Sequence, residues 1–365
     1  MNNITKIGVI GCGNISDAYF KGAKTFTSIQ YAYCADLNME AAKEKEKLYA
    51  CKAVSVEELL ANNEVEIVLN LTTPQVHAKI NTMALQAGKH VYAEKPFALS
   101  MEEGTPVIEL AKKKNLRIGS APDTFLGGGI QTVRKLIDEN WIGTPVSGTA
   151  FMMCSGHESW HPAPEFYYLP GGGPLFDMGP YYITALINLL GPVKKVTAIN
   201  GRASDERTCS SEARFGDKMP VEINTHVAGL LEFECGTIIT LMMSFDIAKH
   251  SCPCLELHGT AGSISVPDPN TFDGPVKFAK ARCDLQEVPI PFGYTDNMRS
   301  IGLADMAKAI RDGRKHRCSG ELAFHVLEVM CALEKSSVEE KHIYIKSSCE
   351  RPEALPLGLL HGELD

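Results

Sequence analysis

The feature that most constrains this chain is a glycine-rich turn that directly follows a short apolar segment. Lys6–Ile10 has the apolar character of a buried strand, and the run Gly11-Cys12-Gly13-Asn14-Ile15-Ser16 comes immediately after it. Helical spacing then continues to Lys24. In a strand–turn–helix unit of this kind, the first glycine makes the tight turn and the second lets the backbone approach a pyrophosphate at the helix N-terminus. We therefore expect a dinucleotide to bind at Gly11, Gly13, Asn14 and Ile15.

An acidic residue stands where dinucleotide-binding folds hold the adenosine ribose. Asp36 comes twenty residues after Ser16 and closes a second strand, Gln30–Ala35. Its carboxylate would accept hydrogen bonds from the ribose hydroxyls and repel a 2′-phosphate, and the next three residues include no Arg or Lys. The sequence therefore favours NAD over NADP as the cofactor.

Strands and helices alternate along the first 120 residues. Later strands are expected at Val65–Leu71, His90–Ala93 and Leu116–Gly119, and helices at Asn38–Tyr49, from Ser55, after Pro74 and from Ser100 or Thr105. Such alternation is typical of a parallel sheet with helices on both faces, because each crossover places a helix against the sheet. At roughly one domain per 150 residues, a chain of 365 residues predicts two domains. We place the boundary near residue 123, which gives units of residues 1–123 and 124–365.

The second half of the chain has a different pattern. An apolar helix through Tyr181–Leu190 is followed by segments with strand character at Val193–Ile199, Thr225–Phe233, Thr237–Phe245, Cys254–His258 and Ser263–Val266. Two helices, Ile301–Asp312 and Glu321–Leu333, come last. Several strands without helices between them indicate an antiparallel sheet.

Composition excludes several classes of protein. The net charge is −8 and there is no long run of Lys or Arg, so a nucleic-acid or anionic-membrane partner is not expected. No stretch approaches the roughly 18 apolar residues of a membrane span, and the apolar run at the N-terminus is too short for a signal peptide. Twelve cysteines are scattered without Cys-x-x-Cys pairs, which favours reduced cysteines in a cytoplasmic protein without a metal site.

Three further segments make the interpretation more specific. They are the run Leu71-Thr72-Thr73-Pro74-Gln75-Val76-His77, the tripeptide Glu94-Lys95-Pro96, and the run from Gly171-Gly172-Gly173 to Asp177-Met178-Gly179-Pro180-Tyr181. With the glycine turn, they resemble the Gfo/Idh/MocA family of oxidoreductases over essentially the whole chain. The resemblance implies an N-terminal Rossmann domain and a C-terminal α/β domain built on a large, mostly antiparallel open-faced sheet. It also implies an active site between the domains and a homo-oligomer, dimer or tetramer, formed through that sheet.

The resemblance also assigns site residues. Lys95 matches the lysine that touches nicotinamide and substrate, and Asp177 matches the acid that supports the substrate. Tyr181 stands where many members have His, which leaves open whether Lys95 or Tyr181 is the main proton donor. Further cofactor contacts are implied at Thr72, Thr73, Pro74, His77 and Glu94.

The chemistry requires the same residue types. Hydride transfer at a secondary alcohol also moves one proton, which a lysine or a tyrosine hydroxyl can carry. If the helix begins just after Gly173, Asp177 and Tyr181 share one face of it, because they are four residues apart. If the helix begins at Pro180, Asp177 precedes it and this argument weakens.

The substrate side is expected in the loop before this helix. Trp160 and His161 combine a flat apolar ring with hydrogen-bonding groups, as sugar sites do, although the loop could equally be a lid or an oligomer contact. Asp123 is a further candidate contact, in a segment that departs from the family pattern.

We thus expect an NAD(P)-dependent oxidoreductase that acts on a hydroxyl or carbonyl of a sugar, cyclic polyol or sugar derivative. Two alternatives are a non-catalytic regulator that senses a nucleotide and an NAD-assisted glycoside hydrolase.

Overall fold

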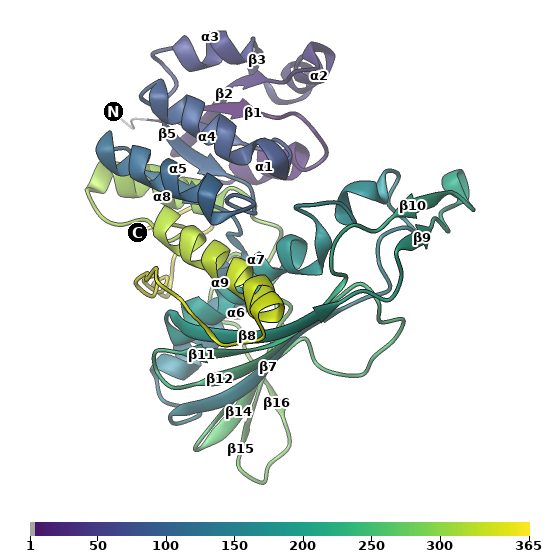
Figure 1. Cartoon of the computed structure of the whole chain (residues 1–365). Coiled ribbons are helices and arrows are strands. Elements are labelled where there is room, and N and C mark those ends of the chain that lie inside the picture. Colours follow the sequence, from purple (N-terminus) through teal and green to yellow (C-terminus); the bar gives the residue numbers. More distant parts are fainter. Residues whose placement is uncertain (1–3) are drawn as a thin grey trace.

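The N-terminal half builds a parallel sheet with strands in the order β3-β2-β1-β4-β5-β6, as the alternating pattern predicts (Figure 1). The structure is a computed structural model and describes residues 4–365, so Met1–Asn3 of the N-terminal segment lie outside the described residues. The strands are β1 (Thr5–Ile10), β2 (Ile29–Ala35), β3 (Lys52–Ala53), β4 (Ile67–Asn70), β5 (His90–Ala93) and β6 (Ile118–Ser120). The strand order reverses between β1 and β4, and ligands of such sheets bind beyond the carboxyl ends of the strands at that reversal. The glycine turn after β1 lies at this position.

Helices cover both faces of this sheet. They are α1 (Ser16–Ala23), α2 (Met39–Tyr49), α3 (Val56–Ala61), α4 (His77–Gln86) and α5 (Met101–Lys113). Three of them, α2, α3 and α5, begin at a capping side chain. Ser55 and Glu58 form a capping box at α3, since each side chain accepts a backbone N–H of the other. Ser100 accepts the Glu103 N–H and so fixes the start of α5, which the sequence left open between two residues.

The C-terminal half contains a nine-stranded sheet in the order β16-β15-β14-β13-β7-β12-β11-β8-β17. Its strands are β7 (Pro145–Met153), β8 (Val193–Gly201), β11 (His226–Phe233), β12 (Ile238–Ser244), β13 (Leu255–Gly259), β14 (Gly262–Val266), β15 (Val276–Lys280), β16 (Gln286–Val288) and β17 (Ile343–Tyr344). Among the strands of this sheet only the β7–β12 pair is parallel, so the expected mostly antiparallel sheet is confirmed. The sequence did not predict β7 and β15–β17 as strands.

Helices pack on one face of this large sheet. They are α6 (Gly128–Asp138), α7 (Gly173–Leu190) and α9 (Gly320–Glu339), whereas β9 (Glu206–Thr208) and β10 (Lys218–Pro220) form a separate pair that projects from the sheet (Figure 1). The start of α7 at Gly173 settles the alternative that the sequence left open. Asp177 and Tyr181 therefore lie one turn apart on the same helix.

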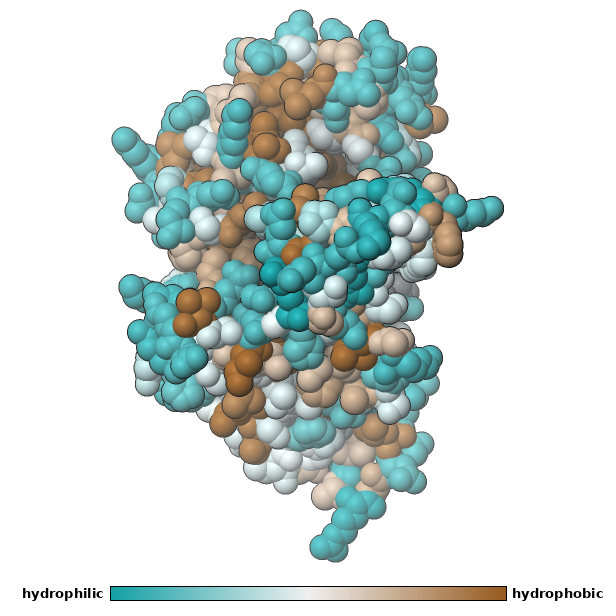
Figure 2. All heavy atoms as spheres, turned by 45° about the vertical axis from the view of Figure 1, so that its right-hand side comes forward, coloured by the Kyte–Doolittle hydropathy of each residue, from teal (hydrophilic) through white to brown (hydrophobic). Residues whose placement is uncertain are grey.

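The surface reflects this division. Teal side chains dominate the β9–β10 projection in Figure 2, while the lower half of that view, over the large sheet, has more white and brown surface. Among residues 4–365, no helix is long and apolar enough to cross a bilayer.

The chain returns to the N-terminal half after completing the large sheet. Helix α8 (Ile301–Asp312) packs beside α1 and β6, and Ser319 forms a β-bridge with Gly119 of β6. The domain boundary near residue 123 therefore stays a prediction. Residues after 300 pack against the N-terminal sheet, although they lie far beyond that boundary in the sequence.

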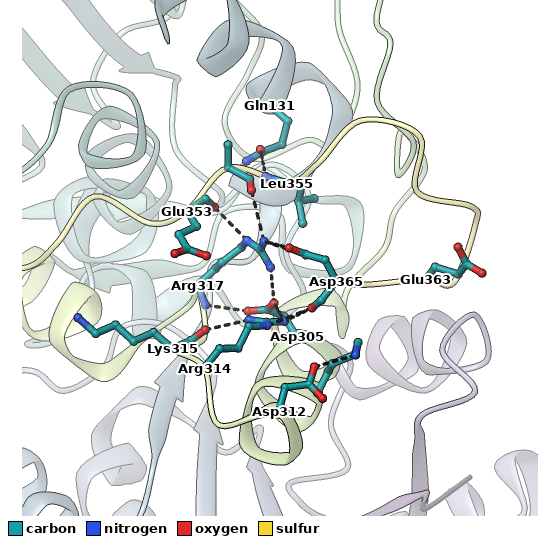
Figure 3. Close-up of polar contacts among 12 residues, drawn as sticks. Gln131, Asp305, Asp312, Arg314, Lys315, Arg317, Glu353, Leu355, Glu363 and Asp365 are labelled. Carbon is teal, nitrogen blue, oxygen red and sulfur yellow. Dashed lines mark hydrogen bonds and ion pairs between the residues drawn. The ribbon is translucent and has the colours of Figure 1, made fainter.

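Two arginines that follow α8 bind the C-terminal segment of the chain, which ends at Asp365 (Figure 3). Arg314 and Arg317 each donate to the buried Asp305 carboxylate of α8, at 2.7 Å and 2.6 Å. Arg317 also donates to both carboxylate oxygens of Asp365 at 2.8 Å. The Leu355 N–H donates to Gln131 Oε1 of α6 at 2.8 Å, so the C-terminal segment ties elements of both halves together.

Candidate active site

The glycine turn forms an open cradle at the start of α1. Gly11 has φ +104°, and a Cβ there would lie 2.5 Å from the Leu71 carbonyl carbon, so only glycine fits. Gly13 is exposed, and a Cβ added there would meet no atom within 4 Å. Asn14 and Ile15 are also exposed beside it. The turn therefore has the free space and the free helix N-terminus that a dinucleotide phosphate requires, and these residues fit NAD.

The Asp36 carboxylate lies against this turn. One oxygen accepts the Cys12 N–H at 2.7 Å and the other accepts the Asn38 N–H at 2.8 Å. These bonds hold the carboxylate at the carboxyl end of β2, next to the cradle. This is the position expected for an acid that binds ribose hydroxyls.

His77 connects the two loops on the other side of the cradle. Its Nδ1 lies 2.7 Å from the Pro96 carbonyl oxygen and its Nε2 lies 2.9 Å from the Thr72 carbonyl oxygen. The ring is wholly buried, and burial lowers its pKa. The structure therefore places His77 beneath the site, where it holds the loops in position, and does not bring it to the open surface.

Lys95 and Asp177 form an ion pair between the two halves of the chain. Lys95 Nζ donates to Asp177 Oδ1 at 2.9 Å and to the Asp177 carbonyl oxygen at 2.7 Å. Burial alone would lower the pKa of Lys95, but attraction to Asp177, Tyr181 and Glu94 outweighs it and raises the pKa. Burial likewise opposes ionisation of Asp177, and Lys95 and His157 together hold its pKa at about 2. The pair is therefore ionised at neutral pH.

Tyr181 lies beside this pair, with two cations close to its ring. Lys95 Nζ is 5.1 Å from the ring centroid and the Arg299 guanidinium carbon is 5.4 Å from it. Arg299 Nη2 also donates to the Tyr181 hydroxyl oxygen at 3.1 Å. Burial raises the pKa of Tyr181, and the two cations act in the opposite direction.

A cleft of about 260 Å³ brings these groups together. The lining residues are Ile15, Thr72, Pro74, Gln75, Glu94, Lys95, Pro96, Phe166, Tyr167, Gly171, Gly172, Phe176, Asp177 and Tyr181. The cleft therefore joins the cofactor turn, the Glu94-Lys95-Pro96 segment and the start of α7. An arrangement of this kind can hold a small molecule against a dinucleotide and supply groups that hold or move a proton.

Two family models match the chain. One, described as "Oxidoreductase family, NAD-binding Rossmann fold", matches residues 5–121, and the other, described as "GFO/IDH/MocA C-terminal domain", matches residues 130–265. The chain belongs to the Gfo/Idh/MocA oxidoreductase family. The resemblance on which the sequence analysis rested is thereby confirmed, as are the fold class and the NAD-binding Rossmann domain.

Relatives of this Gfo/Idh/MocA chain include sugar enzymes. An uncharacterised oxidoreductase of Schizosaccharomyces pombe is 30% identical over 256 residues, which is 68% of this chain and 61% of that protein. Levoglucosan dehydrogenase of Pseudarthrobacter phenanthrenivorans is 25% identical over 309 residues, 76% of this chain and 79% of that enzyme. A structure of levoglucosan dehydrogenase in complex with NADH and L-sorbose has a TM-score of 0.81 at 22% identity, over 94% of this chain and 100% of that chain. This last match shows that the fold is shared.

The structure separates the predicted site residues into two groups. Thr72, Pro74, Glu94, Lys95, Asp177 and Tyr181 line the cleft with Ile15, while Gly11, Gly13, Asn14 and Asp36 form the adjoining cradle. Thr73 is exposed at the start of the turn that leads into α4. The cofactor and catalytic roles of these residues stay predictions.

The predicted substrate contacts are placed differently. Trp160 is 61% exposed, its ring lies edge-on to His161, and neither side chain lines the cleft. Asp123 is completely buried and accepts the backbone N–H groups of Ser300 and Gly302, at 3.1 Å and 3.2 Å. The structure therefore does not bring Asp123 to the substrate side, because protein groups enclose it.

Several residues of the site were not predicted from the sequence. Phe166 and Tyr167 line the cleft, and the crowding of aromatic residues in residues 155–174 was the available signal. His157 Nε2 lies 3.6 Å from Asp177 Oδ2. Arg299 follows no recognisable motif, and no signal in the sequence pointed to it. Within residues 4–365, no group of three or more His, Cys, Asp and Glu side chains gathers around a possible metal position.

Proposed function

We propose that this protein is an NAD-dependent oxidoreductase acting on a secondary hydroxyl or carbonyl group of a sugar, cyclic polyol or sugar derivative. The observation that carries the proposal is the ionised Lys95–Asp177 pair with Tyr181 in a cleft that adjoins the glycine turn. The family match and the sugar-related names of the relatives support the substrate class.

The bound cofactor would supply a nicotinamide that accepts or donates a hydride. This chain's residues would do the rest. Asp177 holds the Lys95 ammonium group by two hydrogen bonds and so fixes its position toward the substrate. Lys95 and Tyr181 hold and move the proton at the substrate oxygen. Phe166 and Tyr167 offer apolar ring faces for the substrate.

The preference for NAD follows from the second strand. The Asp36 carboxylate is fixed beside the cradle, where it would accept bonds from ribose hydroxyls and repel a 2′-phosphate. Leu37 after it is fully exposed and carries no charge that would attract such a phosphate.

Turnover of a sugar and polyol panel tests this function. We expect absorbance at the reduced-nicotinamide band to change with at least one member of the panel, levoglucosan included, and faster with NAD than with NADP. Nucleotide binding without turnover of any member would contradict the dehydrogenase function and favour a nucleotide-sensing regulator. Cleavage of an aryl glycoside without net NADH formation would favour the glycoside hydrolase.

Replacement of Lys95 tests the assignment of the site. Lys95→Met should abolish turnover and leave NADH affinity, measured by fluorescence, within about tenfold of wild type, because the main cofactor cradle is elsewhere. Lys79→Met is the matched control, since Lys79 is exposed on α4. Full activity of the Lys95 variant would refute its role.

We also propose that the protein is a cytoplasmic homo-oligomer, a dimer or tetramer formed through the open face of the nine-stranded sheet. The twelve cysteines, all free within residues 4–365, support a reducing compartment. Exposed apolar side chains on the open face support the oligomer.

A further inference from the structure

Arg299 stands out as a buried cation that the sequence did not indicate. It precedes α8 and is only 7% exposed. Its Nη2 donates to the Tyr181 hydroxyl oxygen at 3.1 Å and to Asn270 Oδ1 at 3.3 Å. Desolvation of a guanidinium opposes folding, so a buried arginine needs hydrogen bonds or a nearby negative charge to offset that cost.

The backbone around Arg299 is held in a strained turn by hydrogen bonds and close packing. Ser300 has φ +94°, a left-handed conformation that is strained for a residue other than glycine. Asp123 stabilises this turn by accepting the N–H groups of Ser300 and Gly302. On the other side, the Arg299 carbonyl oxygen packs so closely on Gly22 of α1 that a Cβ there would be 1.8 Å from it. The backbone that carries Arg299 is therefore held by contacts with Asp123 and Gly22, both in the N-terminal half of the chain.

The charge of Arg299 is only loosely matched by Asp123. Arg299 Nη1 lies 3.9 Å from Asp123 Oδ1, and both atoms are buried without a hydrogen-bond partner among residues 4–365. The best hydrogen bond that Arg299 makes to a side chain is the one to Tyr181.

Hydrogen-bond roles at Tyr181 follow from this arrangement. A guanidinium can only donate, so the Tyr181 oxygen accepts from Arg299 and its own hydrogen stays available to another acceptor. Lys95 is engaged by Asp177 through two of its three N–H groups. The hydroxyl hydrogen of Tyr181 is therefore engaged by neither Arg299 nor Lys95, and Tyr181 lines the cleft in which a substrate oxygen would bind.

Building on the proposed function, we propose that Arg299 is the positioning residue of Tyr181, which is the proton donor of the reaction. In the reducing direction, the substrate carbonyl carbon would accept a hydride from the bound reduced nicotinamide as the C=O π bond opens, while the Tyr181 O–H bond breaks and its proton passes to the carbonyl oxygen, which becomes a hydroxyl. The phenolate that remains is stabilised by Arg299. In the oxidising direction, the phenolate takes the hydroxyl proton back while the carbon-bound hydrogen would leave as a hydride to the oxidised nicotinamide and the C=O bond re-forms.

The charged and titratable groups around Tyr181 shift its pKa in both directions. They are Lys95 and Glu94 after β5, Asp177 on the preceding turn of α7, Arg299 before α8, and the Tyr167 hydroxyl. Lys95 is paired with Asp177, whereas Arg299 makes the direct bond to the phenolic oxygen. Removal of Arg299 should therefore change the ionisation of Tyr181 more than removal of a distant cation.

A titration of the protein without cofactor tests this inference independently of turnover. The eleven tyrosines are replaced by 3-fluorotyrosine, whose phenol is more acidic, and the Tyr181 resonance in the ¹⁹F NMR spectrum is assigned by its loss in Tyr181→Phe. We expect Arg299→Met to raise the pH at which this resonance titrates by about one unit or more. Arg282→Met, which removes an exposed arginine, should leave it unchanged. An unchanged titration in Arg299→Met would overturn the proposal even if the enzyme is active.

Kinetics provide the second measurement. Arg299→Met should lower kcat about a hundredfold with little change in KM and shift the pH dependence of kcat upward, and Arg299→Lys should restore part of both. A purely structural role would lower kcat and raise KM without moving the pH profile, which would also overturn the proposal. If Arg299→Met does not fold, Arg299→Lys decides, since it keeps the charge but loses the 3.1 Å contact and should still raise the Tyr181 titration. Absence of turnover in wild type, with the NMR shift present, would reject the proposed function and leave the Arg299–Tyr181 coupling intact.

Discussion

The Asp123 carboxylate is fully buried where the two halves of the chain meet. Burial raises its pKa from an ordinary value of 3.8 to about 6, against the opposing attraction of Arg299 and two backbone N–H groups. The folded state therefore binds a proton that the unfolded state has released, between about pH 4 and pH 6. In that window the contribution of Asp123 to the free energy of unfolding falls as the pH rises.

Asp123→Asn should remove this pH dependence. Relative to the variant, wild type is expected to lose up to about 3 kcal/mol of unfolding free energy between pH 4 and pH 7, because the asparagine has no proton to release. Urea unfolding at a series of pH values measures the difference. Parallel stability profiles for the two proteins would show that Asp123 is ionised normally in the fold.

At the scale of residues, the sequence allowed prediction of those site residues that belong to a local motif. Lys95 and Asp177 each lie in a recognisable run, and the structure brings them within 2.9 Å. Arg299 lies 118 residues from Tyr181, in a segment without a motif, and only folding brings it to the site. Asp123 was wrongly predicted as a substrate contact for a related reason. A carboxylate next to the domain boundary is expected to be exposed, and the sequence does not show that the start of α8 packs over it.

At the scale of elements, the two glycines of the first turn have separable roles. Gly11 serves the fold, because its φ of +104° and its closeness to Leu71 leave no room for a Cβ. Gly13 leaves open space where the dinucleotide phosphate is expected. The pair therefore offers two matched substitutions, one expected to lower stability and the other to lower cofactor affinity.

Gly11→Ala should destabilise the protein by about 1–3 kcal/mol through backbone strain. Gly13→Ala should leave the melting temperature unchanged and weaken NADH binding by about tenfold or more, since the new methyl group enters the phosphate space. Thermal unfolding without ligand and fluorescence titration with NADH separate the two effects. Equal loss of affinity and stability in both variants would contradict this division.

Regular elements were predictable wherever periodicity and capping agree. The helix that begins at Ile301 ends at Asp312 as the sequence predicts, and β5 spans the expected His90–Ala93. The start of α7 could not be decided, because Gly173 and Pro180 both suit a helix start and only the packed helix shows which one is used. Short strands such as β16 and β17 were not predicted because two or three residues are too few to show a period.

At the scale of the whole molecule, the nine-stranded sheet leaves one face uncovered by helices. Ile199 of β8 lies opposite Ala228 of β11. Leu230 stands two residues after Ala228 on β11 and lies opposite Thr197 and Thr240, so Ile199 and Leu230 share one face of the sheet. Ile199 is 80% exposed and Leu230 is 44% exposed. Exposed apolar side chains grouped on one sheet face are typical of an interface with another protein surface.

Leu230→Asp should weaken association through this face. A carboxylate introduced on this face would lose its hydration when the face is covered, and this desolvation opposes association. Light scattering after gel filtration should show wild type as a dimer or larger and the variant as a monomer at the same concentration. Val338→Asp is the control, because Val338 is 83% exposed on α9, away from this face. A variant that keeps the wild-type mass would place the oligomer contact elsewhere, whereas a monomer that still binds NADH would show that the cofactor cradle is complete within one chain.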